Sequence, residues 1–172
     1  MQIRDSLAQD LPAITAIYAH WVMHGRASFE LDPPDLAEMT RRRDAVLAGG
    51  YPYLVAEAAG EVLGYAYASL YRARPAYRFT VENSVYVRPG GARQGAGRAL
   101  LDTLVQRCAD AGFRLMIAVI GDSANAPSIG LHSAAGFQPA GVLPGTGWKH
   151  GQWVDTVLMT RAIGAGQTAP PV

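Results

Sequence analysis

The spacing of hydrophobic residues changes several times along the chain, and each change predicts a different element. A first helix is predicted to about His24, with Asp10 as its N-cap and Pro12 in its first turn. Its hydrophobic face is Leu11, Ile14, Ile17, Tyr18 and Trp21. A second helix opens with the capping pair Asp35 and Glu38. Two later helices are expected, one ending near residue 112 and one at 127–135. Runs rich in β-branched and aromatic residues predict strands at 2–6, 53–58, 62–68, 80–87, 115–120 and 153–160. The resulting order, βααβββαβαβ with one further strand left open at the end, predicts an α/β or α+β sheet with helices packed on it.

Composition limits the class of protein. The chain has 172 residues, 49% of them hydrophobic, and 15 Lys and Arg stand against 14 Asp and Glu. This length predicts one domain at 1–163 with a loose tail at 164–172, and the hydrophobic content excludes a disordered chain. The balanced charge argues against a nucleic-acid-binding protein, and no apolar run suits a membrane span or signal peptide. Because Cys108 is the only cysteine, an internal disulfide and a cysteine-based zinc site are excluded, and we expect a soluble, cytoplasmic protein.

A glycine-rich turn stands between a predicted strand and an amphipathic helix. It reads Ala92-Arg93-Gln94-Gly95-Ala96-Gly97-Arg98. The first amides of a helix have no intrahelical partner and the helix dipole favours negative charge there, so this turn is a candidate anion site. Gly95 and Gly97 let a phosphate approach the backbone, and Arg93 and Arg98 add charge. A P-loop needs a lysine where Ala96 stands, a dinucleotide-binding GxGxxG is incomplete, and the glycines alone also suit a turn without a ligand.

Two segments together carry a family resemblance. The first runs from Val85-Tyr86-Val87 through the glycine-rich turn, and the second is Asn125-x-x-Ser128-x-x-Leu131-His132-x-x-x-Gly136-Phe137. They resemble the two acetyl-CoA motifs of the GNAT superfamily of N-acetyltransferases. The first motif usually begins with Gln or Arg, and here that position is Ala92. We expect this departure to weaken cofactor binding without abolishing it, with Arg93 as a partial substitute.

Two further strings narrow the resemblance. The segments at 80–87 and 147–155 are similar to the phosphinothricin and methionine sulfoximine acetyltransferase branch, and the likeness extends from residue 2 to about 161. It implies a GNAT fold, with a mixed, mostly antiparallel central sheet flanked by about four helices. It also implies a homodimer that uses acetyl-CoA as acetyl donor and needs no metal. The implied cofactor-binding residues are Val85, Tyr86, Val87, Arg93, Gln94, Gly95, Ala96, Gly97, Arg98, Asn125 and Ser128.

Acetyl transfer to an amine needs a base, because an α-amino group is mostly protonated at neutral pH. Glu82 lies within a hydrophobic strand just before the expected cofactor strand, which suits this role, although a solvent-facing carboxylate at a strand edge is the plain alternative. His132 occupies the place where many GNAT enzymes have a tyrosine that donates to the sulfur of coenzyme A. Its ordinary pKa also permits a role as base, so the sequence leaves open which of the two residues accepts the amine proton.

The acceptor side is predicted from three kinds of residue. Arg72 and Arg74 share one face if their segment is extended, and guanidinium groups bind carboxylate or phosphinate oxygens in pairs. Because arginine is the default cation of this chain, these residues also suit a solvated loop. The resemblance implies that Phe29, with Glu30 beside it, belongs to a lid over the acceptor, and that Glu82, Asn83 and Ser84 contact it. We therefore expect a small amine acceptor that carries an acidic group.

Other functions stay open at this point. Within the enzyme class, the chain could acetylate protein N-termini or another small amine. From a different class, it could be an acyl-CoA-binding module without catalysis, which would need neither Glu82 nor His132.

Overall fold

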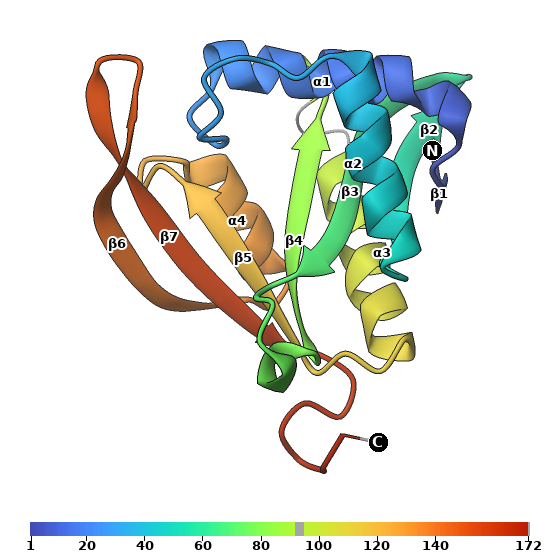
Figure 1. Ribbon diagram of the computed structural model, residues 1–172, viewed down its shortest axis with the longest axis vertical. Coiled ribbons are helices and arrows are strands. Elements are labelled where there is room, and N and C mark those ends of the chain that lie inside the picture. Colours follow the sequence, from blue (N-terminus) through green and yellow to red (C-terminus); the bar gives the residue numbers. More distant parts are fainter. Residues whose placement is uncertain (92–94, 172) are drawn as a thin grey trace.

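A seven-stranded sheet forms the centre of the computed structural model, which describes residues 1–91 and 95–171 (Figure 1). The strands lie in the order β1-β2-β3-β4-β5-β7-β6, and every neighbouring pair is antiparallel except β4 and β5. Their bounds are β1 Gln2–Asp5, β2 Tyr53–Ala58, β3 Glu61–Leu70, β4 Thr80–Val87, β5 Leu115–Gly121, β6 Gln138–Lys149 and β7 Gln152–Ala162. The expected mixed, mostly antiparallel sheet is therefore confirmed.

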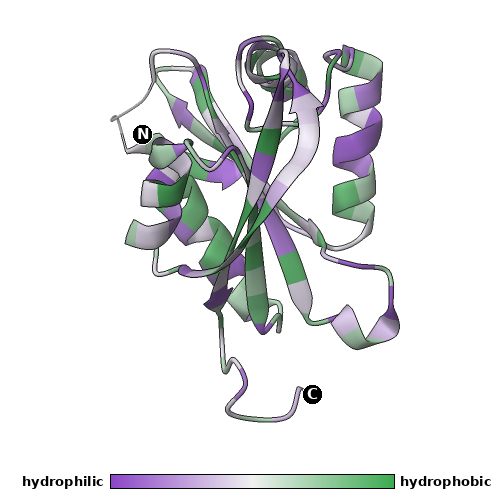
Figure 2. Ribbon diagram, turned by 90° about the vertical axis from the view of Figure 1, so that its left-hand side faces the viewer, coloured by the Kyte–Doolittle hydropathy of each residue, from purple (hydrophilic) through white to green (hydrophobic). Residues whose placement is uncertain are grey.

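Helices cover both sides of this sheet (Figure 2). The described residues form four α-helices, α1 Leu11–His24, α2 Leu36–Ala48, α3 Ala96–Asp110 and α4 Ala126–Ala134, with short 3-10 turns at Ala8–Asp10 and Pro75–Tyr77. Leucines of α3, including Leu100 and Leu104, pack with Val81 and Met116 in an aliphatic core. On the other side, Ile14 and Tyr18 of α1 pack with the tyrosines of β2 and β3. Each side of the sheet thus has a core of its own.

β4 and β5 run side by side for only part of their length. They pair in parallel from Thr80 with Leu115 to Asn83 with Ala118, and the pairing then stops although both strands continue. Beyond Asn83 the two strands separate and leave an opening in the middle of the sheet.

The capping predictions were partly right. Asp35 accepts a hydrogen bond from the backbone N–H of Glu38 and caps α2 as expected. Asp10 does not cap α1 with its side chain, because its buried carboxylate binds the guanidinium of Arg4 and accepts from the N–H of Leu7. An ion pair to β1 has therefore displaced the expected cap.

β6 was not predicted from the sequence, which left a further strand open only after 153–160. It pairs with β7 in a long hairpin. Its register shifts between Pro139 and Gly141 and again between Leu143 and Gly147. Prolines, glycines and these irregularities obscure the alternation expected of a strand.

Residues beyond β7 form turns, and within 164–171 the structure has neither helix nor strand. Ile163, directly after β7, is buried in the aliphatic core. Whether 1–163 folds by itself stays a prediction. No helix of the described chain is long and apolar enough to cross a membrane.

Candidate active site

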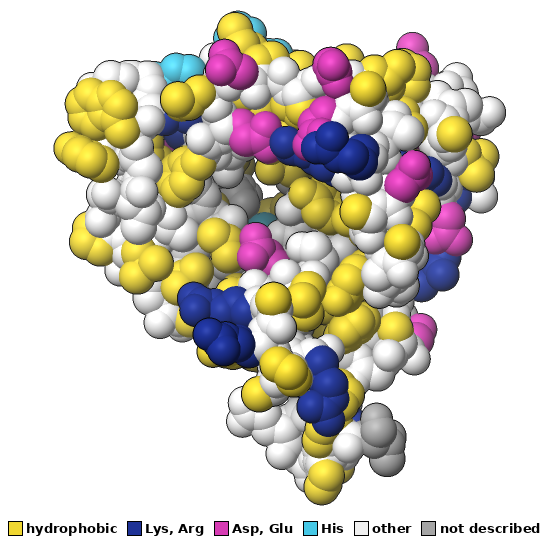
Figure 3. Space-filling view, viewed as in Figure 1, with side chains coloured by type: hydrophobic (Ala, Val, Ile, Leu, Met, Phe, Trp, Pro, Cys, Tyr) yellow, Lys and Arg dark blue, Asp and Glu magenta, His cyan; other side chains and the backbone are white. Residues whose placement is uncertain are grey.

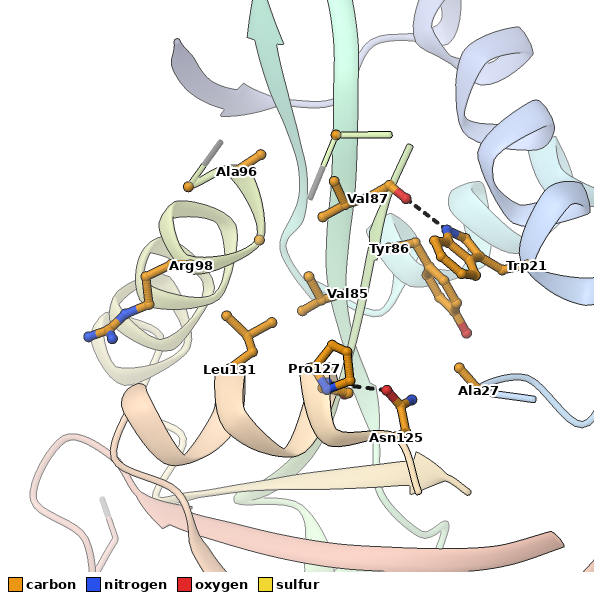
Figure 4. Close-up of a pocket in the computed structure, with 14 residues that line it drawn as sticks. Trp21, Ala27, Val85, Tyr86, Val87, Ala96, Arg98, Asn125, Pro127 and Leu131 are labelled. Atoms are coloured by element: carbon orange, nitrogen blue, oxygen red, sulfur yellow. Dashed lines mark hydrogen bonds between the residues drawn. The ribbon is translucent and has the colours of Figure 1, made fainter. Parts of the chain in front are cut away.

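A cavity lies along the part of β4 that has separated from β5. It has a volume of about 380 Å³, and its walls come from β4, the start of α3, the start of α4 and the end of α1 (Figure 4). A smaller cavity of about 50 Å³ continues into the opening between β4 and β5. From the other side, the surface is hollowed over this opening, and an acidic side chain stands at the rim of the hollow (Figure 3). The opening therefore connects the two faces of the sheet.

The start of α3 forms one end of the larger cavity. Gly95 precedes the helix with a φ of +79°, a left-handed conformation that favours glycine. A Cβ on Gly97 would lie 3.3 Å from Cγ2 of Val87 and 3.5 Å from Cδ2 of Leu131, so a side chain would narrow the cavity. Gly95, Ala96 and Gly97 line it as expected, and their amides form the electropositive end of a 15-residue helix.

Of the arginine and glutamine side chains predicted to bind the cofactor in this turn, the structure describes Arg98 alone. Arg98 also lines the cavity, but its guanidinium binds the carboxylate of Asp102 one helical turn away, and Figure 4 shows the side chain pointing outward. Arg93 and Gln94 lie outside the described residues, as does the departing motif position Ala92. Their expected contacts with the cofactor stay predictions.

The free edge of β4 presents backbone groups to the cavity. Arg88 donates its N–H to the carbonyl of Leu63 on β3 (2.8 Å), and antiparallel strands hydrogen-bond through alternate residues. Val85 and Val87 therefore direct their amides and carbonyls away from β3, toward the opening. The carbonyl of Val87 accepts a hydrogen bond from Nε1 of Trp21 (2.7 Å), which holds α1 against this edge (Figure 4). Val85 thus offers both its N–H and its C=O where the strands part.

The second motif forms the start of α4. Oδ1 of Asn125 accepts from the N–H of Ser128 (3.2 Å) and its Nδ2 donates to the carbonyl of Gly121 (3.3 Å). Asn125 and Ser128 both line the larger cavity. The asparagine therefore caps α4 and fixes its start against the end of β5.

His132 and Asn83 meet inside the protein, on the α3/α4 face of the sheet. His132 is 4% exposed, and its Nε2 lies 3.0 Å from Oδ1 of Asn83 while its Nδ1 lies 2.8 Å from the carbonyl oxygen of Ser128. Nδ2 of Asn83 donates to the carbonyl of Ile117 (3.0 Å), which links β4 to β5 at the point of separation. Both partners of the imidazole are acceptors, so this geometry suits donation by both ring nitrogens. Burial opposes this arrangement, because it lowers the pKa of His132.

Glu82 points to the opposite face. Successive strand residues alternate, so Glu82 and Ser84 share the α1/α2 face with Tyr86, whereas Asn83 shares the other face with Val85. Burial alone raises the pKa of the Glu82 carboxyl above its usual range. Across the β3–β4 pair, Ser84 lies opposite Tyr67, whose pKa is raised by burial and, to a smaller extent, by the charge of Glu82. Glu82 is therefore half-buried among hydroxyl groups, and Asn83 is turned toward His132 instead.

The loop between α1 and α2 covers the edge of the site. The ring of Phe29 packs flat on Gly147 of β6. A Cβ added to Gly147 would lie 3.3 Å from three carbons of this ring. Glu30 accepts from the hydroxyl of Tyr18 (2.8 Å) and from the guanidinium of Arg42 (2.5 Å). The expected lid residues are thus fixed by contacts to three different elements.

Arg72 and Arg74 lie in the segment between β3 and β4. That segment contains bends and a 3-10 turn rather than a strand, so the argument for one shared face does not apply. Both side chains are exposed, and the guanidinium of Arg72 lies 5.2 Å from the ring centroid of Tyr71. The structure leaves them free to contact a molecule above the start of β4.

Two residues contribute to the site in a way that the sequence did not predict. Trp21 was assigned only to the hydrophobic face of a helix, yet its indole N–H holds the edge of β4. The sequence leaves Lys149 open between the acceptor pocket, a dimer interface and a solvated hairpin, yet its side chain is buried. Within residues 1–91 and 95–171, no group of three or more His, Cys, Asp or Glu side chains could hold a metal ion.

Comparisons with known proteins agree with this geometry. The chain matches the Acetyltransferase (GNAT) family over residues 14–137. It is 58% identical to a phosphinothricin N-acetyltransferase of Alcaligenes faecalis over 94% of this chain and 82% of that protein. It is 43% identical to an L-methionine sulfoximine/L-methionine sulfone acetyltransferase of Pseudomonas paraeruginosa, over 98% of both chains.

A solved structure extends the likeness to three dimensions. A phosphinothricin acetyltransferase from Sinorhizobium meliloti in complex with AcCoA superposes with a TM-score of 0.96 at 48% identity, covering 99% of this chain and 92% of that one. The opening between β4 and β5, the glycine-rich start of α3 and these matches lead to one conclusion. The chain belongs to the GNAT family of acetyltransferases.

Proposed function

We propose that the protein transfers the acetyl group of acetyl-CoA to the amino group of a small, amino-acid-like acceptor that carries an acidic group. The names of its relatives point to phosphinothricin, methionine sulfoximine and methionine sulfone as acceptors. The observation that carries the proposal is the opening between β4 and β5, which extends from a cavity ending at the start of α3 to Ser84, on the face of β4 that carries the half-buried carboxylate of Glu82. The expected location in the cytoplasm stays a prediction.

The donor side relies on backbone groups. The amides at the start of α3 suit the diphosphate of coenzyme A, and Val85 and Asn125 lie where its pantetheine arm would enter the opening. Because the N–H of Val85 faces the opening, we assign to it the polarisation of the thioester carbonyl and the stabilisation of the oxyanion that forms on attack. The smaller cavity, between Val85, Ala118 and Val119, has room for a group the size of acetyl.

Glu82 is assigned as the base and His132 as a donor. A carboxyl whose pKa is raised by burial is better matched to an amine proton, and Glu82 faces the side from which an acceptor can approach. Both ring nitrogens of His132 contact protein oxygens, those of Ser128 and Asn83, so neither is open to the ammonium group of an acceptor. Glu82 therefore removes one proton from the ammonium, and the amine attacks the carbonyl carbon. The C–S bond then breaks to release the thiolate, and the second proton that the nitrogen loses in forming the amide balances the proton that the thiolate takes up.

The acidic group of the acceptor is assigned to the arginines before β4. Arg72 and Arg74 are exposed near the strand that carries Glu82, and guanidinium groups bind phosphinate or carboxylate oxygens with two parallel hydrogen bonds. Phe29 and Ser84 complete the proposed contacts from the loop and from the face of β4. Such an arrangement selects an acceptor with an amine and an anion at opposite ends.

The β6–β7 hairpin supports the expected homodimer. Trp148 and Trp153 face each other across it, with ring centroids 5.3 Å apart, and are 57% and 68% exposed. Val142 and Leu143 are also exposed on this edge strand, and a second copy would cover such apolar surface. Light scattering on a size-exclusion column tests this assignment, since a dimer that Trp153→Ser converts to a monomer would support it.

A thiol-release assay tests the proposed function. Purified protein is supplied with acetyl-CoA and a panel comprising phosphinothricin, methionine sulfoximine, methionine sulfone, glutamate and a peptide with N-terminal alanine. Because Cys108 is fully buried, the protein's own thiol will not disturb the reading. We expect release with at least one of the first three acceptors. Release with the peptide alone would assign the enzyme to protein N-termini, and binding of acetyl-CoA without release would make it a binding module.

A further inference from the structure

The loop 25–34 determines the shape of the site, because one of its residues lies at the centre of the cavities. Ala27 lines the larger cavity, the opening between β4 and β5 and a neighbouring polar cavity. The carbonyls of Arg26 and Ala27 lie so close to Gly121 that a Cβ there would be 2.4 and 2.9 Å from them. A small displacement of this loop would therefore change the walls of the site.

Lys149 is the only lysine of the sequence and it is buried beneath this loop. It ends β6, is 2% exposed, and its Nζ donates to the carbonyl oxygen of Ser28 (2.7 Å). Burial lowers the pKa of the ammonium, and Glu30 partly opposes this effect. A buried ammonium is costly, so its presence calls for a reason other than stability alone.

The strand that carries Lys149 ends at a tight turn and packs against the loop. His150 and Gly151, which connect β6 to β7, both have positive φ, +49° and +74°, as in the tight two-residue turns of β-hairpins. Gly147 lies on the same face of β6 as Lys149, and Phe29 packs on it. The hairpin therefore contacts two consecutive residues of the loop, one through a hydrogen bond to the backbone and one through an aromatic ring.

We propose that Lys149 is a positioning residue that fastens the 25–34 loop over the acceptor side of the site. This inference rests on the proposed function, since the loop carries Phe29 and Glu30. The hydrogen bond is made to a backbone carbonyl, so it fixes the path of the loop and not one side chain. Tyr18 supports the same position by bonding Oγ of Ser28 (2.9 Å).

The stability of a Lys149→Met variant distinguishes a positioning role from a merely structural one. Burying an ammonium costs free energy, and Lys149→Met removes this cost together with the hydrogen bond to Ser28, so the two effects on overall stability oppose each other. Lys149→Met should therefore change the melting temperature little while it frees the loop. A fall in overall stability, with no local effect, would identify a structural role.

Limited proteolysis measures how often the 25–34 loop opens, and it does so without depending on enzyme activity. Arg26 is the only trypsin site within 25–34, and Arg107 in α3 serves as the reference site in the same molecule. Cleavage of a segment that opens transiently follows the population of its open form. For Lys149→Met we expect cleavage after Arg26 to accelerate about tenfold or more, the range for losing a hydrogen bond to a charged group, with cleavage after Arg107 unchanged.

Kinetics with an accepted acceptor complete the test. The acceptor KM should rise about tenfold in Lys149→Met, partly recover in Lys149→Arg, and leave the KM for acetyl-CoA unchanged. His150→Asn is the matched control, because His150 is exposed and its contact with the same loop, at the Gly25 carbonyl, is longer (3.3 Å). Equal acceleration at Arg26 and Arg107, unchanged cleavage at Arg26, or faster cleavage with an unchanged acceptor KM would each overturn the proposal. An enzyme that turns over no acceptor would contradict the proposed function, while the cleavage at Arg26 would still report on the anchor.

Discussion

The α3/α4 face of the sheet is lined by aliphatic side chains, whereas the α1/α2 face is lined by tyrosines. On the first face, leucines of α3 pack on Leu54, Val81 and Met116. On the second, the rings of Tyr53 and Tyr65 stack 5.8 Å apart, those of Tyr53 and Tyr67 5.1 Å apart, and those of Tyr65 and Tyr86 5.3 Å apart. The same strand, β4, belongs to both faces.

This difference divides the chemistry of the proposed reaction. The aliphatic face contributes a packed core. The acetyl donor is assigned to backbone amides and the start of a helix beside this core, which need no charged side chain to bind it. The tyrosine face combines apolar rings with hydroxyl tips, so Glu82 can be half-buried there. Burial raises the pKa of the tyrosines, that of Tyr18 to about 12, so they stay neutral beside the carboxylates. We infer that one face holds the donor and the other activates the acceptor.

The largest expected effect comes from the carboxylate on the tyrosine face. Glu82→Gln keeps the size and hydrogen-bonding capacity of the side chain but removes its ability to accept a proton. We expect kcat/KM to fall about 10²-fold or more, the range for loss of a general base, with the affinity for acetyl-CoA unchanged. The pH–rate profile checks the assignment. In the native enzyme the rate should fall as pH drops through the raised pKa of Glu82, and this limb should vanish in the variant. An identical profile would remove Glu82 from the role.

A smaller effect is expected from the histidine on the aliphatic side. His132→Ala leaves Oδ1 of Asn83 buried without its partner, which should lower the free energy of unfolding by about 1–3 kcal/mol. Urea denaturation measures this change. We expect kcat to fall less than in Glu82→Gln and the acidic limb of the pH profile to remain. Loss of that limb in His132→Ala would make His132 the base and reverse the assignment of the two faces.

The arginines before β4 test where the acceptor's acid binds. The double variant Arg72→Ala/Arg74→Ala should raise the acceptor KM about tenfold, because charge-assisted hydrogen bonds are lost, and should spare acetyl-CoA binding. Stability should change little since both side chains are exposed. Titration of each ligand by calorimetry separates the effects. An unchanged acceptor affinity would move the anion site elsewhere.

The smallest effect concerns the donor cavity. Gly97→Ala should favour α3, since alanine is the better helix former by about 0.5–1 kcal/mol, but its Cβ narrows the cavity and should raise the KM for acetyl-CoA. Gly130→Ala is the matched control, because a Cβ there meets no atom within 4 Å outside its own helix. It should add stability without changing either KM. Equal KM values in the two variants would contradict the placement of the donor beside Gly97.

Local patterns predicted most of the fold, and they failed where distant contacts decide the outcome. The apolar spacing located α1 and α3 and a capping pair located α2, but nothing local showed that Asp10 would bind Arg4 instead of capping a helix. β6 was missed because prolines and glycines interrupt its alternation, and only its pairing with β7 makes it a strand.

The candidate site divides in the same way. Glu82 and His132 were identified from strings of neighbouring residues, and the alternation along β4 already implies that Glu82 and Asn83 face opposite sides. Lys149 is 121 positions from Ser28, to which it donates a hydrogen bond, and Trp21 is 66 positions from Val87. No short window of sequence contains either pair.

The central claim is that donor and acceptor meet through the opening in the sheet, with the amine on the Glu82 side. A crystal structure with coenzyme A and phosphinothricin bound together tests this claim most directly. We predict the sulfur at the opening beside the Val85 amide and the acceptor nitrogen within hydrogen-bond reach of the Glu82 carboxylate. An acceptor bound on the His132 side, or a sulfur placed away from the separation of β4 and β5, would contradict the account.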